Sequence, residues 1–384
     1  MFHRLVRVVR RVCDALVPPS PQPPAPSPET AALAADVAFM QRRIKHALGE
    51  RGDYPIPSWH EWSVWEPTVQ FALRDLCRPR DTVIDVGANA GAIAMVMSRL
   101  VGLDGRVYAF EASQRIVGKT QYNLAQQGCG NTQVFHNAVF SESGKELPLW
   151  YGADLNDSVI QHDGAPSEVV KTVALDDFCA HWGISPRVIK MDIEGAEYDA
   201  LLGMPRLIAK DRPHLILEQQ QEDMRCFDLL TRAGYRCIDL GSYREIVGPE
   251  SIEGKNSLLN LLYVPNERLA ELPYDVPPRL DEIEGGDRLM SEPVTLAPGR
   301  YIIKADMVAE SSASSLQVGV TVDDAPAVRY HAAGNFISNS YRHFPIELDQ
   351  PRKVEFFHRF TDGTSDPSFK LKSIRILKLV LRQG

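Results

Sequence analysis

The chain has 384 residues, of which 44% are hydrophobic, enough to bury a full core, and its length predicts two domains. Its net charge of −8 argues against a nucleic-acid partner, because proteins of that class usually carry a basic surface. No apolar run reaches the length of a membrane span. The six dispersed cysteines favour buried thiols in a reducing compartment, so we expect a cytoplasmic protein.

The first 28 residues are expected to form a tail. Met1–Val17 places apolar residues at helical spacing, with arginines on the opposite side. A frayed basic end is the favoured reading, because one short helix gives little membrane affinity; a weak contact with anionic lipid or a partner protein is the alternative. Pro18–Pro28 is rich enough in proline to predict a semi-rigid tether.

Residues 29–78 are expected to form a helical region. Thr30–Leu48 is rich in alanine and carries apolar side chains on one face, which predicts a helix. Trp59, Trp62 and Trp65 recur at every third position. Such a stripe more often packs than binds, so we expect it to pin a helix onto the following domain rather than to form a lid over a ligand.

Residues 79–265 alternate between strand and helix patterns, which predicts a mainly parallel sheet covered on both faces. Two strand patterns between Ser141 and Thr172 interrupt this alternation and predict a β-hairpin insertion. The stretch from Gly241 to Ser257 lacks a helix long enough for a parallel crossover, so the seventh strand is expected to be antiparallel, with strand order 3-2-1-4-5-7-6. The expected strands are Thr82–Val86, Arg106–Glu111, Thr132–Asn137, Arg187–Asp192, His214–Glu218, Tyr235–Leu240 and Leu258–Val264, with the hairpin at Glu146–Tyr151 and Val169–Ala174. The expected helices are Ala92–Val101, Ser113–Gln127, Leu175–Trp182, Glu194–Gly203 and Glu222–Ala233.

The composition changes after Val264. Residues 266–280 are rich in proline and are expected to be a linker, and residues 281–384 show only strand patterns. Leu316, Val318, Val320 and Val322 alternate with less apolar residues, which predicts a strand with one buried face and, with its neighbours, an all-β sandwich. The expected strands are Tyr301–Val308, Leu316–Asp323, Ala327–His331, His343–Leu348, Lys353–Phe360 and Phe369–Leu381.

A nucleoside pocket is indicated by the turn after the first strand. Gly87 and Gly91 allow close approach of the backbone to a ligand, and Glu111 ends the next strand, where an acid can accept hydrogen bonds from both ribose hydroxyls. The Gly-x-Gly-x-x-Gly spacing for a pyrophosphate is absent, because Asn89 stands at its second glycine. The pattern therefore favours S-adenosylmethionine over NAD or ATP.

Several blocks in order resemble the FkbM family of methyltransferases. They are Val83–Gly91, Gly105–Glu111, Asn137-Ala138, Val173–Asp177, Ile189–Glu197 and Leu215–Glu218. The resemblance covers roughly residues 66–264 and departs from the family at Ala112, where a proline is usual. It implies a class I Rossmann-like fold and S-adenosylmethionine-dependent methylation, typically of a hydroxyl on a sugar or a natural product.

The expected cofactor-binding residues lie at the ends of the first three strands. Asp85 is expected to reach the amino-acid end of the cofactor, and Asn137 the adenine edge. The full set is Asp85, Gly87, Ala88, Asn89, Gly91, Glu111, Asn137 and Ala138.

A second group of charged residues surrounds the expected fourth and fifth strands. A hydroxyl is a poor nucleophile, so its methylation needs a base, or a metal that lowers its pKa. We expect Asp192 and Glu194 to act without a metal, with His214 as another candidate base; Asp192, Glu194 and Glu218 form the alternative metal set. Capping of the following helix would also explain Asp192 and Glu194. Lys190 belongs to the same group, and Glu197 is expected to be structural.

Two further features bear on the acceptor. Asn156, Asp157 and Ser158 lie at the tip of the hairpin insertion and are a candidate substrate loop. The sandwich carries aromatic and histidine residues that are either packing, a dimer contact or a sugar platform: Tyr330, His331, Phe336, Tyr341, His343, Phe356, Phe357 and His358.

The sequence thus predicts an O-methyltransferase acting on a sugar hydroxyl of a glycan or glycosylated intermediate. Methylation of a small natural product at oxygen or nitrogen is the alternative within the enzymes. A non-catalytic scaffold is the alternative outside them, although it would not need to keep Asp85, Gly87 and Glu111 together. A homo-oligomer is possible.

Overall fold

The computed structural model describes residues 66–152, 157–160, 166–220, 223–252, 258–308, 315–333, 343–360 and 369–382. The predictions for the tail, for the helix at Thr30–Leu48 and for the three tryptophans lie outside these residues, as do Asn156, Phe336 and Tyr341. Within them, no helix combines the length and the apolar character that crossing a bilayer requires.

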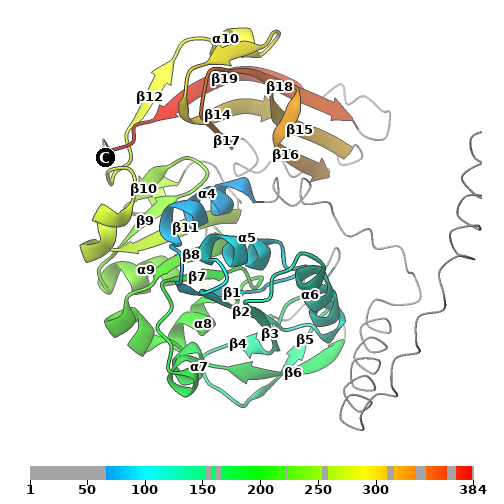
Figure 1. Ribbon diagram of the computed structural model, residues 1–384, viewed down its shortest axis with the longest axis vertical. Helices are drawn as coiled ribbons and strands as arrows, with labels where there is room; N and C mark the ends of the chain where they lie inside the picture. The colour runs from blue at the N-terminus through cyan, green and yellow to red at the C-terminus, as the bar shows by residue number, and fades with distance from the viewer. Residues whose placement is uncertain are drawn as a thin grey trace, which may run out of the picture. The chain divides into compact units, whose positions relative to one another are not determined.

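The centre of the first part of the chain is an eight-stranded sheet in the order β10-β9-β11-β8-β7-β1-β2-β3 (Figure 1). β11 runs antiparallel to both β8 and β9, while β3, β2, β1, β7 and β8 pair in parallel. The predicted order 3-2-1-4-5-7-6 is confirmed, with β10 as an added edge strand. The strands are β1 (Thr82–Val86), β2 (Arg106–Glu111), β3 (Thr132–His136), β7 (Val188–Met191), β8 (His214–Gln220), β9 (Tyr235–Asp239), β10 (Arg244–Ile246) and β11 (Leu258–Pro265).

Helices cover the two faces of this sheet, each over its own apolar core. One core contains side chains of α4 (Pro67–Leu76) and α5 (Ala92–Val101), and Leu124 of α6 (Gln114–Gln126). The other contains side chains of α7 (Leu175–Trp182), α8 (Glu197–Leu202) and α9 (Arg225–Arg232). Figure 1 shows α4 and α5 on the opposite side of the sheet from α7 and α8. This two-sided burial explains the near-continuous apolar pattern of the parallel strands.

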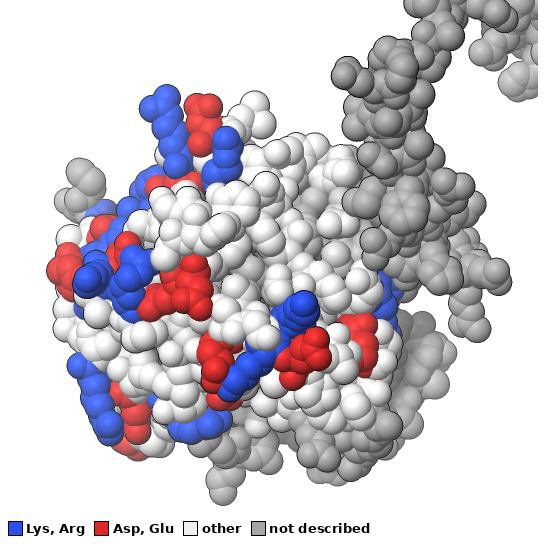
Figure 2. Space-filling view, turned by 90° about the horizontal axis from the view of Figure 1, so that it is seen from below, with Lys and Arg blue, Asp and Glu red and all other residues white. Residues whose placement is uncertain are grey.

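The predicted hairpin insertion is present. β5 (Glu146–Leu149) pairs antiparallel with β6 (Glu168–Val173), and β4 (Ala138–Val139) joins β6 in parallel. On the face shown in Figure 2, acidic and basic side chains are interspersed, and the described residues drawn there form no continuous basic surface.

The last part of the chain forms two four-stranded antiparallel sheets, β12-β19-β14-β17 and β13-β18-β15-β16. Both contribute to one apolar core, which includes Val318 and Val320 as their alternation predicts. The strands are β12 (Leu280–Ile283), β13 (Val294–Leu296), β14 (Gly299–Val308), β15 (Ser315–Val322), β16 (Ala325–Ala333), β17 (His343–Leu348), β18 (Arg352–Phe360) and β19 (Lys370–Leu379); a short helix, α10 (Gly286–Leu289), lies between β12 and β13.

These sheets are joined to the α4 face by polar and apolar contacts. The Arg300 guanidinium donates to both carboxylate oxygens of Asp75 in α4, at 2.6 and 2.9 Å, and both residues are buried. Ile302 and Leu377 share the apolar core of α4 and α5. Tyr274, in the segment that connects the two parts, is buried in the same core.

Candidate active site

The turn after β1 is shaped by its glycines. Gly87 and Gly91 have φ of +79° and +91°, in the left-handed region where residues other than glycine are strained. A Cβ at Gly87 would lie 1.8 Å from the carbonyl oxygen of Asp192, and one at Gly91 would meet Thr120 and Leu124 at 3.3 Å. At Gly87 and at Gly91, the position that a Cβ would occupy therefore faces protein atoms. Close packing of the turn accounts for glycine at both positions, while their approach to the cofactor stays a prediction.

Asp85 is fully buried at the end of β1. The amide of Ala94 lies near enough to lower its pKa somewhat, but neither carboxylate oxygen makes a hydrogen bond of normal geometry with a described residue. Burial dominates and raises the pKa of Asp85 to about 7, against the lowering effect of Lys190. A buried acid without a donor favours a positively charged or donating ligand beside it.

Glu111 ends β2 and is held by the backbone of two neighbouring turns. Its carboxylate accepts the N–H of Asn89 at 2.9 Å and the N–H of Ser113 at 2.8 Å, one on each oxygen. Burial raises its pKa to about 7, while these two bonds act in the opposite direction. Each oxygen keeps a second lone pair, so the predicted acceptance from ribose hydroxyls fits the geometry. Ala88 is buried in the same turn.

Asn137 and Ala138 lie where β3 gives way to β4. The Asn137 amide donates to the carbonyl of Lys171 in β6 at 3.1 Å, and Ala138 is buried. Asn137 thus ties the insertion to the end of β3. Its contact with adenine stays a prediction.

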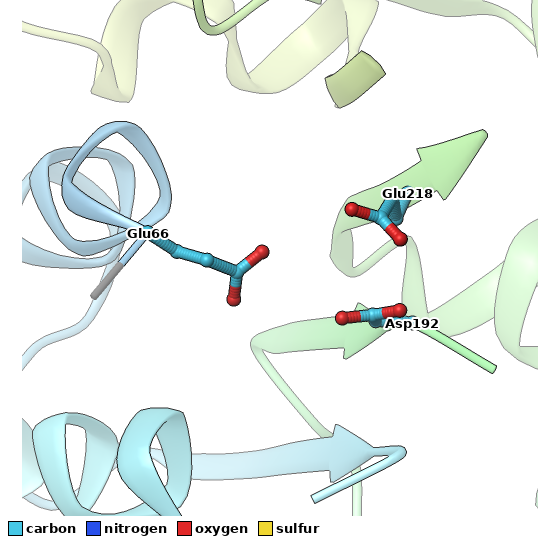
Figure 3. Close-up of side chains that lie close together, drawn as sticks. All are labelled: Glu66, Asp192 and Glu218. Carbon is cyan, nitrogen blue, oxygen red and sulfur yellow. The ribbon is translucent and has the colours of Figure 1, made fainter. Parts of the chain in front are cut away.

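Three acids from separate parts of the chain lie close together near the carboxyl ends of β7 and β8. Glu66 immediately precedes α4, Asp192 follows β7, and Glu218 lies in β8; one carboxylate oxygen of each lies within 4.8 Å of the others (Figure 3). Lys190 is buried beside them, with Nζ 3.0 Å from Asp192 Oδ2 and 3.7 Å from Glu66 Oε2. Burial is the main cause of the raised pKa of both Glu66 and Glu218.

Glu194 lies beside this group but outside it. Its φ is +55°, and burial, with the charge of Asp192, raises its pKa to about 6. Glu197 stabilises the backbone just before its own helix, α8. Its carboxylate accepts the N–H of Ile193 at 2.9 Å and that of Gly195 at 3.4 Å. This bonding supports the structural role expected for Glu197.

His214 is not brought to the acidic group. It is the first residue of β8 and pairs in register with Val188, so it lies at the amino-terminal edge of the parallel strands. Its side chain is fully buried, with Nε2 3.0 Å from Glu271 Oε2, and burial lowers its pKa to about 4. A base there has no route to a methyl group held at the other edge, which corrects the prediction of His214 as a base.

The insertion reaches both halves of the site. Arg115, in α6, forms an ion pair with the buried carboxylate of Asp157, which also raises the pKa of Glu111. The hydroxyl of Ser158 donates to the carbonyl of Glu194 at 3.0 Å. These contacts place Asp157 and Ser158 between the end of β2 and the loop after β7, where a substrate loop was expected.

Sequence patterns missed Glu66. It lies 126 residues before Asp192 (192 − 66), ahead of the first strand, and joins the group only because α4 packs on the sheet. The one local signal is the Glu66-Pro67 step, since proline favours the first turn of a helix.

Comparison with known proteins identifies this part of the chain. Residues 85–237 match the model of the methyltransferase FkbM domain. The chain carries an FkbM methyltransferase domain. S-adenosylmethionine is the methyl donor of this family, and the turn after β1, Asp85 and Glu111 all fall at the start of the matched range.

Individual relatives of the FkbM domain are distant. The protein-L-isoaspartate O-methyltransferase of Methanococcoides burtonii is 29% identical over 87 residues, which are 22% of this chain and 43% of that protein. The chain thus spans less than half the length of that relative. Methyltransferase FkbM from Methylobacillus flagellatus KT is 16% identical, with a TM-score of 0.34 and 60% of each chain covered. Fibrillarin of Aeropyrum pernix, solved with S-adenosyl-L-methionine, is 12% identical, with a TM-score of 0.34 and coverage of 53% of this chain and 76% of that one.

Proposed function

We propose that this chain transfers a methyl group from S-adenosylmethionine to a hydroxyl of a saccharide or glycosylated intermediate. The main support is the place of Asp192 and Glu194 directly after β7. The Asp192 N–H donates to the carbonyl of Val86 at 3.0 Å, so the two acids adjoin the turn after β1. Ligands of open α/β sheets bind at this edge, beyond the carboxyl ends of the strands.

The chemistry needs a proton acceptor at this point. The acceptor oxygen attacks the methyl carbon as the bond from that carbon to sulfur breaks, and the sulfonium becomes a neutral thioether. The hydroxyl proton passes to a carboxylate, for which we propose Asp192 or Glu194. Positioning of the oxygen in line with the methyl group supplies the rest of the acceleration.

A saccharide is proposed as acceptor because the FkbM resemblance implies hydroxyl acceptors on sugars or natural products. The C-terminal sheets would present it. His343 and Phe356 are buried, whereas Phe357 is half-buried and His358 is exposed, which leaves the latter two for contact with a sugar. We expect Phe357→Ala to raise the KM for the saccharide while leaving the affinity for S-adenosylmethionine unchanged.

Cofactor binding is tested by calorimetric titration of the full chain with S-adenosylmethionine. Glu111→Ala should weaken binding at least tenfold, because it removes the proposed ribose acceptor. Glu292→Ala, an exposed acid in the C-terminal part, is the control and should bind like the wild type. Absence of binding by the wild type would favour the alternative hypothesis of a non-catalytic scaffold.

Acceptor class is tested by transfer of a labelled methyl group to a panel of saccharides, polyketide-type alcohols, amines and an isoaspartyl peptide. The isoaspartyl peptide is included because of the Methanococcoides burtonii relative. Labelling of saccharides is the expected result. Labelling confined to any other class would contradict the proposed acceptor.

A further inference from the structure

The three acids shown in Figure 3 have the spacing of metal ligands. One oxygen from each of Glu66, Asp192 and Glu218 lies within 4.8 Å of the other two. A point equidistant from three oxygens 4.8 Å apart lies about 2.8 Å from each, against about 2.1 Å for a bond from oxygen to Mg²⁺. The three carboxylates can therefore contact one ion with small side-chain movements.

Among the described residues, one lysine lies against the three acids. Lys190 contributes one positive charge and contacts Asp192 and Glu66. The three carboxylates together carry up to three negative charges. A half-buried excess of negative charge beside a single lysine favours binding of a further cation.

Two further polar groups lie near the three acids, on the same face of the sheet. Asp85 is the register partner of Lys190, so both side chains lie on the α4 face of the sheet, and its fully buried carboxylate has no hydrogen-bonding partner among the described residues. Asn260 stands opposite Glu218 on β11. Its amide nitrogen lies 3.5 Å from Glu66 Oε1, and its buried Oδ1 has no partner in the described part of the chain.

We propose that Glu66, Asp192 and Glu218 bind one divalent cation of the Mg²⁺ or Mn²⁺ class. Asn260 Oδ1 supplies a neutral fourth oxygen. Hard cations of this class prefer carboxylate and carbonyl oxygens, the atom types that Glu66, Asp192, Glu218 and Asn260 offer. This site differs from the set predicted from sequence, because Glu66 takes the place of Glu194.

The role of the ion rests on the proposed function. Bound beside the acceptor hydroxyl, a divalent cation lowers the pKa of that hydroxyl and orients its oxygen. The proton still passes to a carboxylate, and the methyl group still leaves sulfur for oxygen. Lys190 donates to Asp192 Oδ2 at 3.0 Å and so fixes the position of that carboxylate.

The site is tested by titrating the full chain with Mn²⁺, without S-adenosylmethionine, and following free Mn²⁺ by electron paramagnetic resonance. We expect one saturable ion per chain, displaced by excess Mg²⁺. Glu66→Gln and Glu218→Gln should each weaken binding at least tenfold. Glu194→Gln removes a neighbouring charge from outside the three-acid group and should change affinity less than threefold.

Failure of this proposal is distinguishable from failure of the proposed function. Absence of saturable Mn²⁺ binding, or equal weakening by all three variants, would overturn the site. Methyl transfer at full rate in excess EDTA would overturn the role of the ion while leaving the transferase activity intact. Saturable Mn²⁺ binding without methyl transfer to any acceptor would support the site and count against the proposed function.

Discussion

At the scale of single residues, Gly87 couples the two halves of the site. Its backbone lies against the carbonyl of Asp192, so the turn after β1 and the loop after β7 hold each other in position. This contact excludes any side chain at position 87, in addition to the strain that the positive φ would impose on one. Gly144 has a similar φ of +83° but has open space where a Cβ would lie.

Alanine substitutions at these two glycines should separate the two effects. Gly87→Ala should lower the free energy of unfolding by about 3 kcal/mol, because it adds a clash to an unfavourable φ. Gly144→Ala should lower it by about 1 kcal/mol, the cost of the φ value. Chemical denaturation measures both, and equal losses would show that the contact with Asp192 is unimportant.

His214 makes stability depend on pH. In the folded protein its pKa is lowered from 6.5 to about 4 by burial, so the folded state resists protonation more than the unfolded state does. Between these values the unfolded chain binds more protons, and stability is therefore lost as pH falls from about 6.5 to about 4. The loss attributable to this group is up to about 3 kcal/mol.

The measurement is the free energy of unfolding from pH 7 to pH 4 for the wild type and for His214→Gln. Gln can still donate to Glu271 but does not titrate, so its curve should fall less steeply over this range. His181→Gln, at an exposed position, should follow the wild type. Parallel curves for the wild type and His214→Gln would contradict the account.

At the scale of elements, α4 links the C-terminal sheets to the site. Glu66 is the N-cap of α4, and Asp75 lies in its last turn. Asp75 forms an ion pair with Arg300 of β14. Arg300 also lies 5.5 Å from the ring centroid of Phe71, in the middle of α4. The helix that presents Glu66 is therefore anchored to β14 by buried contacts.

Breaking this buried pair should be costly. Asp75→Asn should lower the free energy of unfolding by about 3 kcal/mol, because it leaves Arg300 buried without its counter-charge. Asp281→Asn breaks the exposed pair with Arg279 and should cost less than about 1 kcal/mol. The double variant Asp75→Asn/Arg300→Met should recover part of the loss. Similar effects of the two single variants would rule out a special role for the α4 contact.

Sequence patterns predicted the long elements well, because their signals are local. Apolar periodicity and glycine positions located β1, β2, α5 and α7 to the residue. The short strands β10, β12 and β13 were missed, since three or four residues carry too little periodicity. The prediction of His214 as a base could have been rejected from the sequence. His214 is the first residue of its predicted strand, whereas ligands bind at the carboxyl ends of parallel strands.

At the scale of the whole molecule, the expected linker turned out to be packed. Tyr274 and Leu272 lie in the same apolar core as α4 and Ile302, so the two parts of the chain share buried surface. Contacts of this kind, like the arrival of Glu66 at the acidic group, join residues far apart in sequence. No local pattern encodes them, whereas the turn after β1, Asp192 and Glu194 lie within contiguous motifs, so their places in the fold were predictable.

The central claim is that the acids after β7 accept a proton during methyl transfer from S-adenosylmethionine to a hydroxyl. The most direct measurement is the single-turnover rate of labelled methyl transfer to the best saccharide acceptor by the wild type and by Asp192→Asn, with S-adenosylmethionine affinity measured in parallel by calorimetry. We expect the rate to fall at least a hundredfold, as for loss of a general base, while the affinity changes less than threefold. Unchanged rates of transfer by both Asp192→Asn and Glu194→Gln, measured in the same way, would contradict the account.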